Sequence, residues 1–356
     1  MFDGPQFGGI AKSNLDLANE FIKQGHIVTL IIKSADGPRK LQINAEAKFC
    51  ILGNKRAVGI VLSLCGFFVK ERPDLIIVSN LMPGLLAQIA RLFCFSKVNL
   101  AVVSHINVFR NLKDRDFPLR KKIFLKYLVP HLLTKQVKVI SLTEQARDGI
   151  AKILRRNIDD IQVIYNPIVV SDDNRANFLS EINWWEDSGL KIIVLGRIDP
   201  LKDIPTVLRA VALINDLNPK VLVVGEGPSR AALEDLSFEL GVDSSVKFIG
   251  FIPNPSLLLS HANILVSASL SEALPLNLAE ALTVGVQVVA ADCDFGPREI
   301  LGDNEWGLLI PLQDSSAMAD GIRRVHDNPF PLKLLKNRAA DFNSDRIAKK
   351  FLELFY

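Results

Sequence analysis

Short apolar runs rich in β-branched residues alternate with helical patterns along the chain, and this alternation constrains the fold more than any other feature of the sequence. In the first half the runs lie at 27–32, 75–78, 100–103, 137–141 and 163–164. Strands that alternate with helices build parallel sheets, which helices cover on both faces. We therefore predict a doubly wound α/β domain over residues 1–170.

The alternation restarts after a polar stretch at 171–189, which we interpret as a linker. The second set of runs lies at 191–195, 220–224, 246–248, 264–266 and 286–290. A length of 356 residues suits two domains better than a single core. We predict a second doubly wound, Rossmann-like domain over 190–335 and a closing helix over 336–356, which can cross back to the first domain. Ligands of such folds bind beyond the carboxyl ends of the strands, so we expect the domains to face a cleft.

The net charge of +3 conceals an uneven distribution along the chain. Residues 1–167 hold 25 Lys and Arg against 13 Asp and Glu, whereas residues 168–356 hold 17 against 26. A basic half joined to an acidic half indicates that only the first half faces a phosphate-rich or anionic lipid surface.

The densest basic stretch, 110–126, carries seven Lys and Arg, two Asp and several interleaved apolar residues. This mixture is typical of a helix that lies on an anionic membrane leaflet. We expect Arg120, Lys121, Lys122 and Lys126 to face the membrane. One alternative is a solvated helix that packs its apolar side on its own domain. A nucleic-acid contact lacks any recognised binding motif in this stretch, so we predict no nucleic-acid partner.

Cysteine usage and hydropathy limit the cellular setting. The four cysteines have no C-x-x-C spacing and lie in apolar stretches, so we interpret them as reduced core residues. No run approaches 18 uninterrupted apolar residues, and the first residues lack the basic start and apolar stretch of a signal peptide. We predict a cytoplasmic protein, peripheral on the inner face of the plasma membrane.

Two cations follow the first strand of the second domain. Arg197 and Lys202 lie five residues apart in a turn that begins at Gly196. At the carboxyl end of a parallel strand, an arginine and a lysine together can clamp a diphosphate. The alternative is a solvated loop with two ordinary surface charges.

A second turn, after the run at 264–266, carries two carboxylates around a predicted helix start. Pro275 suits the first helical turn, so the backbone N–H groups near Leu276 and Asn277 could bind an anion. Glu272 in the loop and Glu280 in the helix could then hold hydroxyls on either side of a bound diphosphate. The alternatives are a cap of the helix for Glu272 and a solvated helix face for Glu280.

These turns and several others occur in one order that resembles a known family. The matching segments are the Glu272-x7-Glu280 spacing, the turn at 196–202, the segments at 224–228, 248–251 and 296–301, and in the first half those at 7–9, 17–30 and 164–167. Together they closely resemble the family 4 retaining glycosyltransferases of the GT-B fold, over nearly the whole chain.

The resemblance implies roles for the charged residues of the second domain. It implies that Arg197 and Lys202 bind the diphosphate of a nucleotide-sugar donor. It further implies that Glu280 binds the ribose hydroxyls and that Glu272 holds the transferred sugar. No metal or other cofactor is expected, because the sequence holds no His/Cys cluster and no Walker A sequence. Arginine and lysine would instead stabilise the charge that develops on the departing diphosphate.

The resemblance also implies contacts from uncharged positions. The backbone at Phe251 and Ile252 would meet the nucleobase, and Gly8 and Gly9 would let the N-terminal loop approach the donor phosphate closely. His105 matches a cleft histidine that contacts the donor sugar, although a lone histidine is more often structural.

Two departures from the family pattern bear on these expectations. The turn usually written Glu-Gly-Phe reads Glu272-Ala273-Leu274 here. Members usually open with a hydrophobic strand before the Gly-Gly loop, whereas only residues 1–6 precede it here, so we expect the first sheet to lack a central strand.

The resemblance implies a retaining transferase that moves a hexose or N-acetylhexosamine to a glycan or lipid-linked glycan in surface-polysaccharide biosynthesis. The turn at 296–299 favours a UDP-linked donor. The alternatives are a nucleotide-sugar-binding module without activity and a nucleotide-sugar epimerase built on the same fold.

Overall fold

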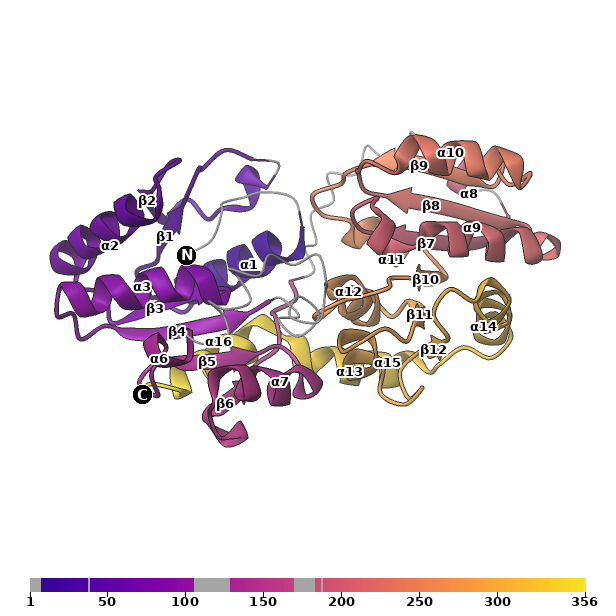
Figure 1. Cartoon of the computed structure of the whole chain (residues 1–356). Helices are drawn as coiled ribbons and strands as arrows, with labels where there is room; N and C mark the ends of the chain where they lie inside the picture. The colour runs from indigo at the N-terminus through magenta and orange to yellow at the C-terminus, as the bar shows by residue number, and fades with distance from the viewer. Residues whose placement is uncertain (1–7, 38, 106–128, 170–182, 187) are drawn as a thin grey trace. The chain divides into compact units, whose positions relative to one another are not determined.

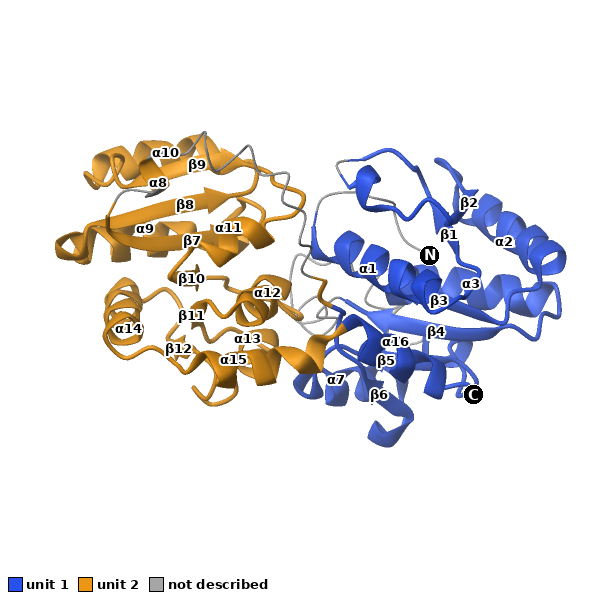
Figure 2. Cartoon of the chain, turned by 180° about the vertical axis from the view of Figure 1, so that it is seen from behind, with its two compact units in different colours: residues 1–167, 344–356 blue, residues 168–343 orange. Residues whose placement is uncertain are grey.

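The computed structural model describes residues 8–37, 39–105, 129–169, 183–186 and 188–356 (Figure 1). The chain divides into two compact units, of which unit 1 comprises 1–167 and 344–356 and unit 2 comprises 168–343 (Figure 2). The second unit thus ends at Asn343 rather than at the predicted 335. The reason is local, because Phe342 is fully buried in unit 2 and its carbonyl accepts a hydrogen bond from the Ile168 N–H, at 2.8 Å.

The described residues of unit 1 form six parallel strands in two sheets. The two-stranded sheet pairs β1 (Thr29–Ile32) with β2 (Lys48–Ile51). The four-stranded sheet has the order β3-β4-β5-β6, with its strands at Leu75–Ser79, Asn99–Ser104, Lys138–Ser141 and Ile161–Val163. No ladder joins β1 to β3 among the residues for which the structure gives positions.

The helices of unit 1 follow its strands in the expected alternation. They are α1 (Gly9–Lys23), α2 (Ala57–Glu71), α3 (Leu81–Phe93), α6 (Val129–Leu132) and α7 (Glu144–Leu154). Helix α16 (Ser344–Glu353) returns to unit 1, where it packs on α1 and buries Ile347 and Phe351. The Ser344 hydroxyl donates to the Glu20 carboxylate at 2.7 Å, which fixes the first turn of α16.

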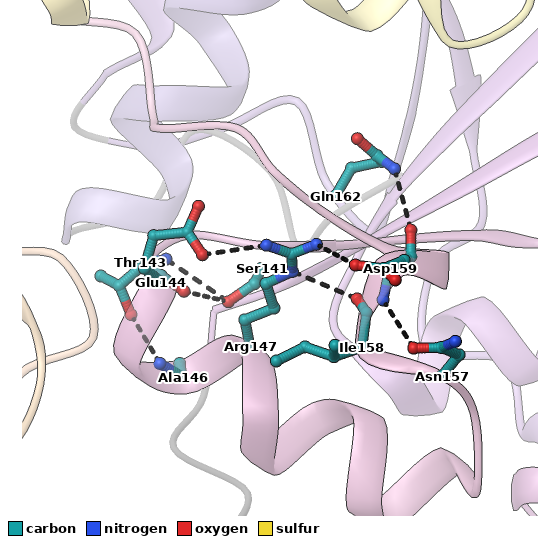
Figure 3. Close-up of polar contacts among 9 residues, drawn as sticks. All are labelled: Ser141, Thr143, Glu144, Ala146, Arg147, Asn157, Ile158, Asp159 and Gln162. Atoms are coloured by element: carbon teal, nitrogen blue, oxygen red, sulfur yellow. Dashed lines mark hydrogen bonds and ion pairs between the residues drawn. The ribbon is translucent and has the colours of Figure 1, made fainter.

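A capped helix start holds the crossover between β5 and β6 (Figure 3). The Thr143 hydroxyl accepts a hydrogen bond from the Ala146 N–H at 3.1 Å and caps α7. The Arg147 guanidinium then pairs with Glu144 at 3.1 Å and with Asp159 at 3.6 Å. These contacts fasten the helix to the short turn that leads into β6.

Unit 2 is built on one six-stranded parallel sheet of order β12-β11-β10-β7-β8-β9. In chain order the strands are β7 (Leu190–Leu195), β8 (Pro219–Val224), β9 (Val246–Gly250), β10 (Ile264–Ser267), β11 (Gln287–Ala291) and β12 (Leu308–Ile310). The central strands are almost wholly buried, as expected for a sheet covered on both faces.

The helices of unit 2 connect these strands. They are α8 (Asn183–Glu186), α9 (Ile204–Leu213), α10 (Arg230–Glu239), α11 (Ser256–Ser260), α12 (Leu276–Val284), α13 (Gly296–Leu301), α14 (Ser315–Asp327) and α15 (Leu332–Ala339). Helix α8 fastens the linker to unit 2, because Trp185 is buried and the ammonium groups of Lys220 and Lys247 lie 4.9 and 4.7 Å from the Trp184 ring.

The structure corrects two predictions about elements. Strands β2 and β12 were missing from the predicted runs, because both are edge strands of three or four residues. The closing segment 336–356 is not one helix, since α15 ends at Ala339 and α16 begins at Ser344. All four cysteines are free, as predicted: Cys293 is buried, and Cys50, Cys65 and Cys94 are partly buried and pack against the core of unit 1.

Candidate functional site

The strand order of unit 2 reverses between β7 and β10. Strands β7, β8 and β9 extend to one side of this point, and β10, β11 and β12 extend to the other. Open α/β sheets bind ligands at the carboxyl ends of the two strands that flank such a reversal. Arg197 and Lys202 follow β7, and Glu272 follows β10, so the fold brings these predicted site residues to one edge of the sheet.

Glycines pack the turn after β7 against the turn after β8. A Cβ on Gly225 would lie 1.8 Å from the Gly196 carbonyl oxygen, and one on Gly227 would lie 2.0 Å from that of Ile198. The Ile198 N–H donates to the Glu226 carbonyl at 2.9 Å. The motif Gly225-Glu226-Gly227 therefore supports the loop that carries Arg197.

Lys202 and Glu272 form an ion pair, with 2.5 Å between Nζ and Oε1, although they lie 70 residues apart. Only 24% and 15% of their side chains are exposed. The Leu270 N–H donates to the Leu201 carbonyl at 2.8 Å and holds the two loops together. The cation predicted for the diphosphate and the carboxylate predicted for the sugar thus meet directly.

Cys293 lies beside this ion pair, which the sequence did not indicate. It follows β11, and burial together with the charge of Glu272 raises the pKa of its thiol to about 12. The thiol therefore stays protonated and acts as a small apolar group next to Glu272. Its place after the next strand of the sheet was the signal that could have revealed it.

Arg197 takes a more open position than Lys202. Its side chain is largely exposed, and its nearest carboxylate is Asp199 at 3.7 Å. A small cavity at this edge of the sheet is lined by Arg197, Lys202 and two serines, Ser267 and Ser269, whose hydroxyl oxygens are 3.3 Å apart. The serines are further polar groups that the sequence reasoning missed.

Helix α12 begins at Leu276, so Pro275 is its N-cap and not part of the first turn, where it was predicted. The N–H groups of Leu276 and Asn277 fall in its first turn, where a helix supplies no acceptor of its own. The Asn277 side chain instead donates to the Leu195 carbonyl at 2.9 Å and ties α12 to the end of β7. Glu280 is buried, so its alternative interpretation as a solvated helix face is wrong.

The loop before α12 is held by the neighbouring turn. A Cβ on Gly296 would lie 2.3 Å from Pro275 Cδ and 2.9 Å from the Ala273 carbonyl oxygen. The backbone at Gly296 thus packs directly against the Glu272-Ala273-Leu274 turn and supports it. Phe251 and Ile252 follow β9 and are partly exposed, and the Gly225 N–H donates to the carbonyl of the preceding Gly250 at 2.8 Å.

Among the predicted site residues of unit 1, His105 lies at the carboxyl end of β4. His105 follows β4 and is buried, and its N–H donates to the Asn80 side chain at 3.2 Å. Burial lowers the pKa of its imidazole to about 4, so the ring is neutral near pH 7. The Ser79 hydroxyl donates to Asn14 in α1 at 2.9 Å, which places the start of α1 at the same edge.

Gly8 and Gly9 begin α1. Gly8 has a φ of 100°, a conformation that side-chain-bearing residues rarely adopt, and its surroundings leave space for a close approach. The four cations predicted to face a membrane, Arg120, Lys121, Lys122 and Lys126, lie outside the described residues. Over the described ranges, no helix is long and apolar enough to cross a bilayer.

Two family models match successive parts of the chain. The model described as Glycosyltransferase Family 4 matches residues 7–172, and the one described as Glycosyl transferases group 1 matches residues 178–342. The chain belongs to the family 4 glycosyltransferases. The predicted family is confirmed, and the two matched ranges fall in both units of the chain.

Solved structures show the fold of this family 4 chain. The structure of Anabaena Alr3699/HepE in complex with UDP superposes with a TM-score of 0.78 at 17% identity, over 99% of this chain and 98% of that one. A glycosyltransferase from Rickettsia africae gives 0.80 at 15% identity, over 99% and 96%. The fold is GT-B with two tandem Rossmann-like domains, as predicted.

Curated relatives share part of their length with this family 4 chain. A Campylobacter jejuni N-acetylgalactosamine-N,N'-diacetylbacillosaminyl-diphospho-undecaprenol 4-alpha-N-acetylgalactosaminyltransferase is 29% identical over 60% of this chain. A poly(ribitol-phosphate) alpha-N-acetylglucosaminyltransferase of Staphylococcus aureus is 25% identical over 87% of it. In each case the match spans 62% of the relative, so the chain covers about three fifths of these proteins.

Proposed function

We propose that this protein is a retaining glycosyltransferase that moves a hexose or N-acetylhexosamine from a UDP-linked donor to a glycan or lipid-linked glycan in surface-polysaccharide biosynthesis. The observation that carries the proposal is the convergence of Arg197, Lys202 and Glu272 at the reversal of strand order in unit 2. The UDP complex of the Anabaena protein and the diphospho-undecaprenol in the name of the Campylobacter relative support the classes of donor and acceptor.

The two cations would promote departure of the nucleoside diphosphate. As the bond between the sugar C1 and the diphosphate oxygen breaks, negative charge gathers on that oxygen, and Lys202 and Arg197 stabilise it. The acceptor hydroxyl oxygen forms the new bond to C1, and its proton passes to the departing phosphate oxygen. Glu272 would accept hydrogen bonds from sugar hydroxyls and Glu280 from the ribose, roles that follow from the family.

Unit 1 would supply the neutral His105 and the glycine start of α1. A neutral imidazole can hydrogen-bond a sugar hydroxyl without attracting a second anion to the site. Gly8 would allow the start of α1 to approach the donor phosphate, as the resemblance implies.

Nucleotide binding tests the donor site. We expect UDP and UDP-sugars to raise the midpoint of thermal unfolding, since a ligand at 100 times its Kd adds about 2.7 kcal/mol. Lys202→Ala should abolish this shift, whereas Lys333→Ala on the exposed face of α15 should leave it intact. An equal shift for both variants contradicts the assignment of Lys202.

A turnover assay distinguishes the proposed transferase from the two alternatives, a nucleotide-sugar-binding module and a nucleotide-sugar epimerase. We expect UDP release from a UDP-sugar to depend on added lipid-linked or polysaccharide acceptor. Donor binding without release would identify a binding module, and conversion of the donor sugar without acceptor would identify an epimerase. Either result contradicts the transferase proposal.

We further propose that the protein is cytoplasmic and works at the inner face of the plasma membrane, with the basic stretch 110–126 of unit 1 toward anionic lipid. The charge of this stretch and the lipid-linked substrate in the name of the Campylobacter relative support this. Replacing Lys121, Lys122 and Lys126 by Glu should reduce binding to anionic vesicles without changing UDP affinity. Equal vesicle binding by parent and variant contradicts this contact.

A further inference from the structure

Helix α2 is apolar on the side that faces solvent. Val58, Leu62 and Val69 are 72%, 66% and 61% exposed, and Gly66, also exposed, completes a stripe with spacings of four, four and three residues. Residues with these spacings share one face of an α-helix. A helix that is apolar all round is ordinarily buried on every side.

The inward face of α2 is already used by the fold of unit 1. Leu64 and Phe68 are buried in its core, together with residues of β3 and β4. The Cys65 thiol lies 3.5 Å from the Ala90 carbonyl, so α2 runs beside α3 (Figure 1). The exposed stripe is therefore additional to the surface that packing requires.

Two phenylalanines extend the apolar surface at one end. Phe93, the last residue of α3, and Phe95 are 75% and 91% exposed. Helix α2 leads into β3 and α3 leads into β4, and these two strands pair in parallel, so the last turns of the two helices lie at the same end. We call the exposed apolar residues of α2 and the end of α3 the α2 face: Val58, Leu62, Val69, Phe93 and Phe95.

Positive charge surrounds the α2 face. Lys55 and Arg56 precede α2, Lys70 and Arg72 lie at its end, and Lys97 follows α3. The segments 55–72 and 91–97 together contain six Lys and Arg and a single acidic residue, Glu71. A helix of 15 residues is about 22 Å long, so cations stand at both ends of an apolar stripe.

We infer that the α2 face binds an anionic lipid surface, with α2 lying in the plane of the membrane. An apolar stripe flanked by cations is the pattern of helices that enter the boundary between headgroups and acyl chains. A second copy of the chain fits less well, because a symmetric dimer would place this basic face against itself. This inference rests on the proposed role of unit 1 at the membrane and adds a contact made by described residues.

Vesicle binding tests the α2 face. We expect the Leu62→Glu/Val69→Glu variant to lose at least tenfold in its partition onto vesicles of phosphatidylglycerol and phosphatidylcholine, because two carboxylates replace inserted side chains. The matched control Leu213→Glu/Phe238→Glu changes two exposed apolar residues of unit 2 and should bind as the parent does. Lys70→Ala should weaken binding about fivefold, since one cation contributes about 1 kcal/mol at the surface.

Further measurements separate the possible outcomes. A Val69→Trp reporter should shift its emission to the blue on anionic vesicles and not on pure phosphatidylcholine. Equal partition of Leu62→Glu/Val69→Glu and parent overturns the inference, and so does a parent dimer that this variant dissociates. UDP affinity of the variant should equal that of the parent. If Leu62→Glu/Val69→Glu loses vesicle binding but keeps turnover, the result supports membrane binding by the α2 face. If the parent and all variants lack turnover, the result contradicts only the proposed function.

Discussion

Lys202 contacts a carboxylate where a diphosphate is proposed to bind, so ligand binding requires an exchange of partners. Its ammonium pairs with Glu272 in a partly buried setting. A diphosphate must displace this carboxylate and also tolerate its negative charge nearby. The pair thus opposes binding of a bare nucleotide, whereas a sugar on the donor gives Glu272 hydroxyl groups to bind instead.

Glu272→Gln should therefore change UDP affinity and sugar transfer in opposite directions. We expect UDP to bind about fivefold more tightly, a gain of about 1 kcal/mol, because the competing charge is gone. Transfer should fall at least tenfold, since the charged acceptor for the sugar hydroxyls is lost. Titration calorimetry and a turnover assay measure the two effects, with the exposed Glu305→Gln as control. Weaker UDP binding by Glu272→Gln contradicts the exchange.

His105 should make the stability of unit 1 depend on pH. Its folded pKa of about 4 lies below the unfolded value of 6.5, so the unfolded chain binds more protons between these values. Stability should therefore fall as the pH drops from about 6.5 toward 4, by up to about 3 kcal/mol. His105→Asn should remove this part of the pH dependence in denaturant titrations, whereas the exposed His326→Asn should keep it.

At the scale of elements, the stacked turns after β7 and β8 leave no space for side chains. Gly225→Ala should destabilise unit 2 by at least about 2 kcal/mol and weaken UDP binding, because its Cβ would meet the Gly196 carbonyl beside Arg197. Gly241→Ala is the matched control, since its φ of 67° is also positive but its surroundings are open. It should lose only about 1 kcal/mol and bind UDP normally. If Gly225→Ala and Gly241→Ala lost equal stability, the loss would come from the backbone conformation at each glycine and not from the contact of the added Cβ.

The sequence predicted the buried elements better than the exposed ones. Strands such as β7 and β8 are continuous apolar runs because helices cover both faces of their sheet. Edge strands β2 and β12 bury fewer residues and carry a weaker signal. The turns after β7 and β10 were predicted to carry the site, since both follow recognisable strands. The pairing of Lys202 with Glu272 depends on strand order, which no local pattern contains.

At the scale of the whole molecule, two phenylalanines nine residues apart are buried in different units. Phe342 is buried in unit 2 and Phe351 in unit 1. Each change to alanine should cost about 3–5 kcal/mol in its own unit. Hydrogen exchange should quicken in β3–β6 for Phe351→Ala and in β7–β12 for Phe342→Ala. Faster exchange of both units in either variant would contradict this division.

Helix α16 belongs to unit 1 but follows unit 2 in the sequence, which determines the order in which the two units can complete their folding. A ribosome adds this helix after the whole of unit 2, yet the helix packs on α1, which precedes unit 2 in the sequence. Domains ordinarily fold one after another as they emerge. Here unit 2 can complete its sheet while unit 1 still waits for its final helix. A premature stop codon just before Ser344 would therefore damage unit 1, most of which is translated before unit 2.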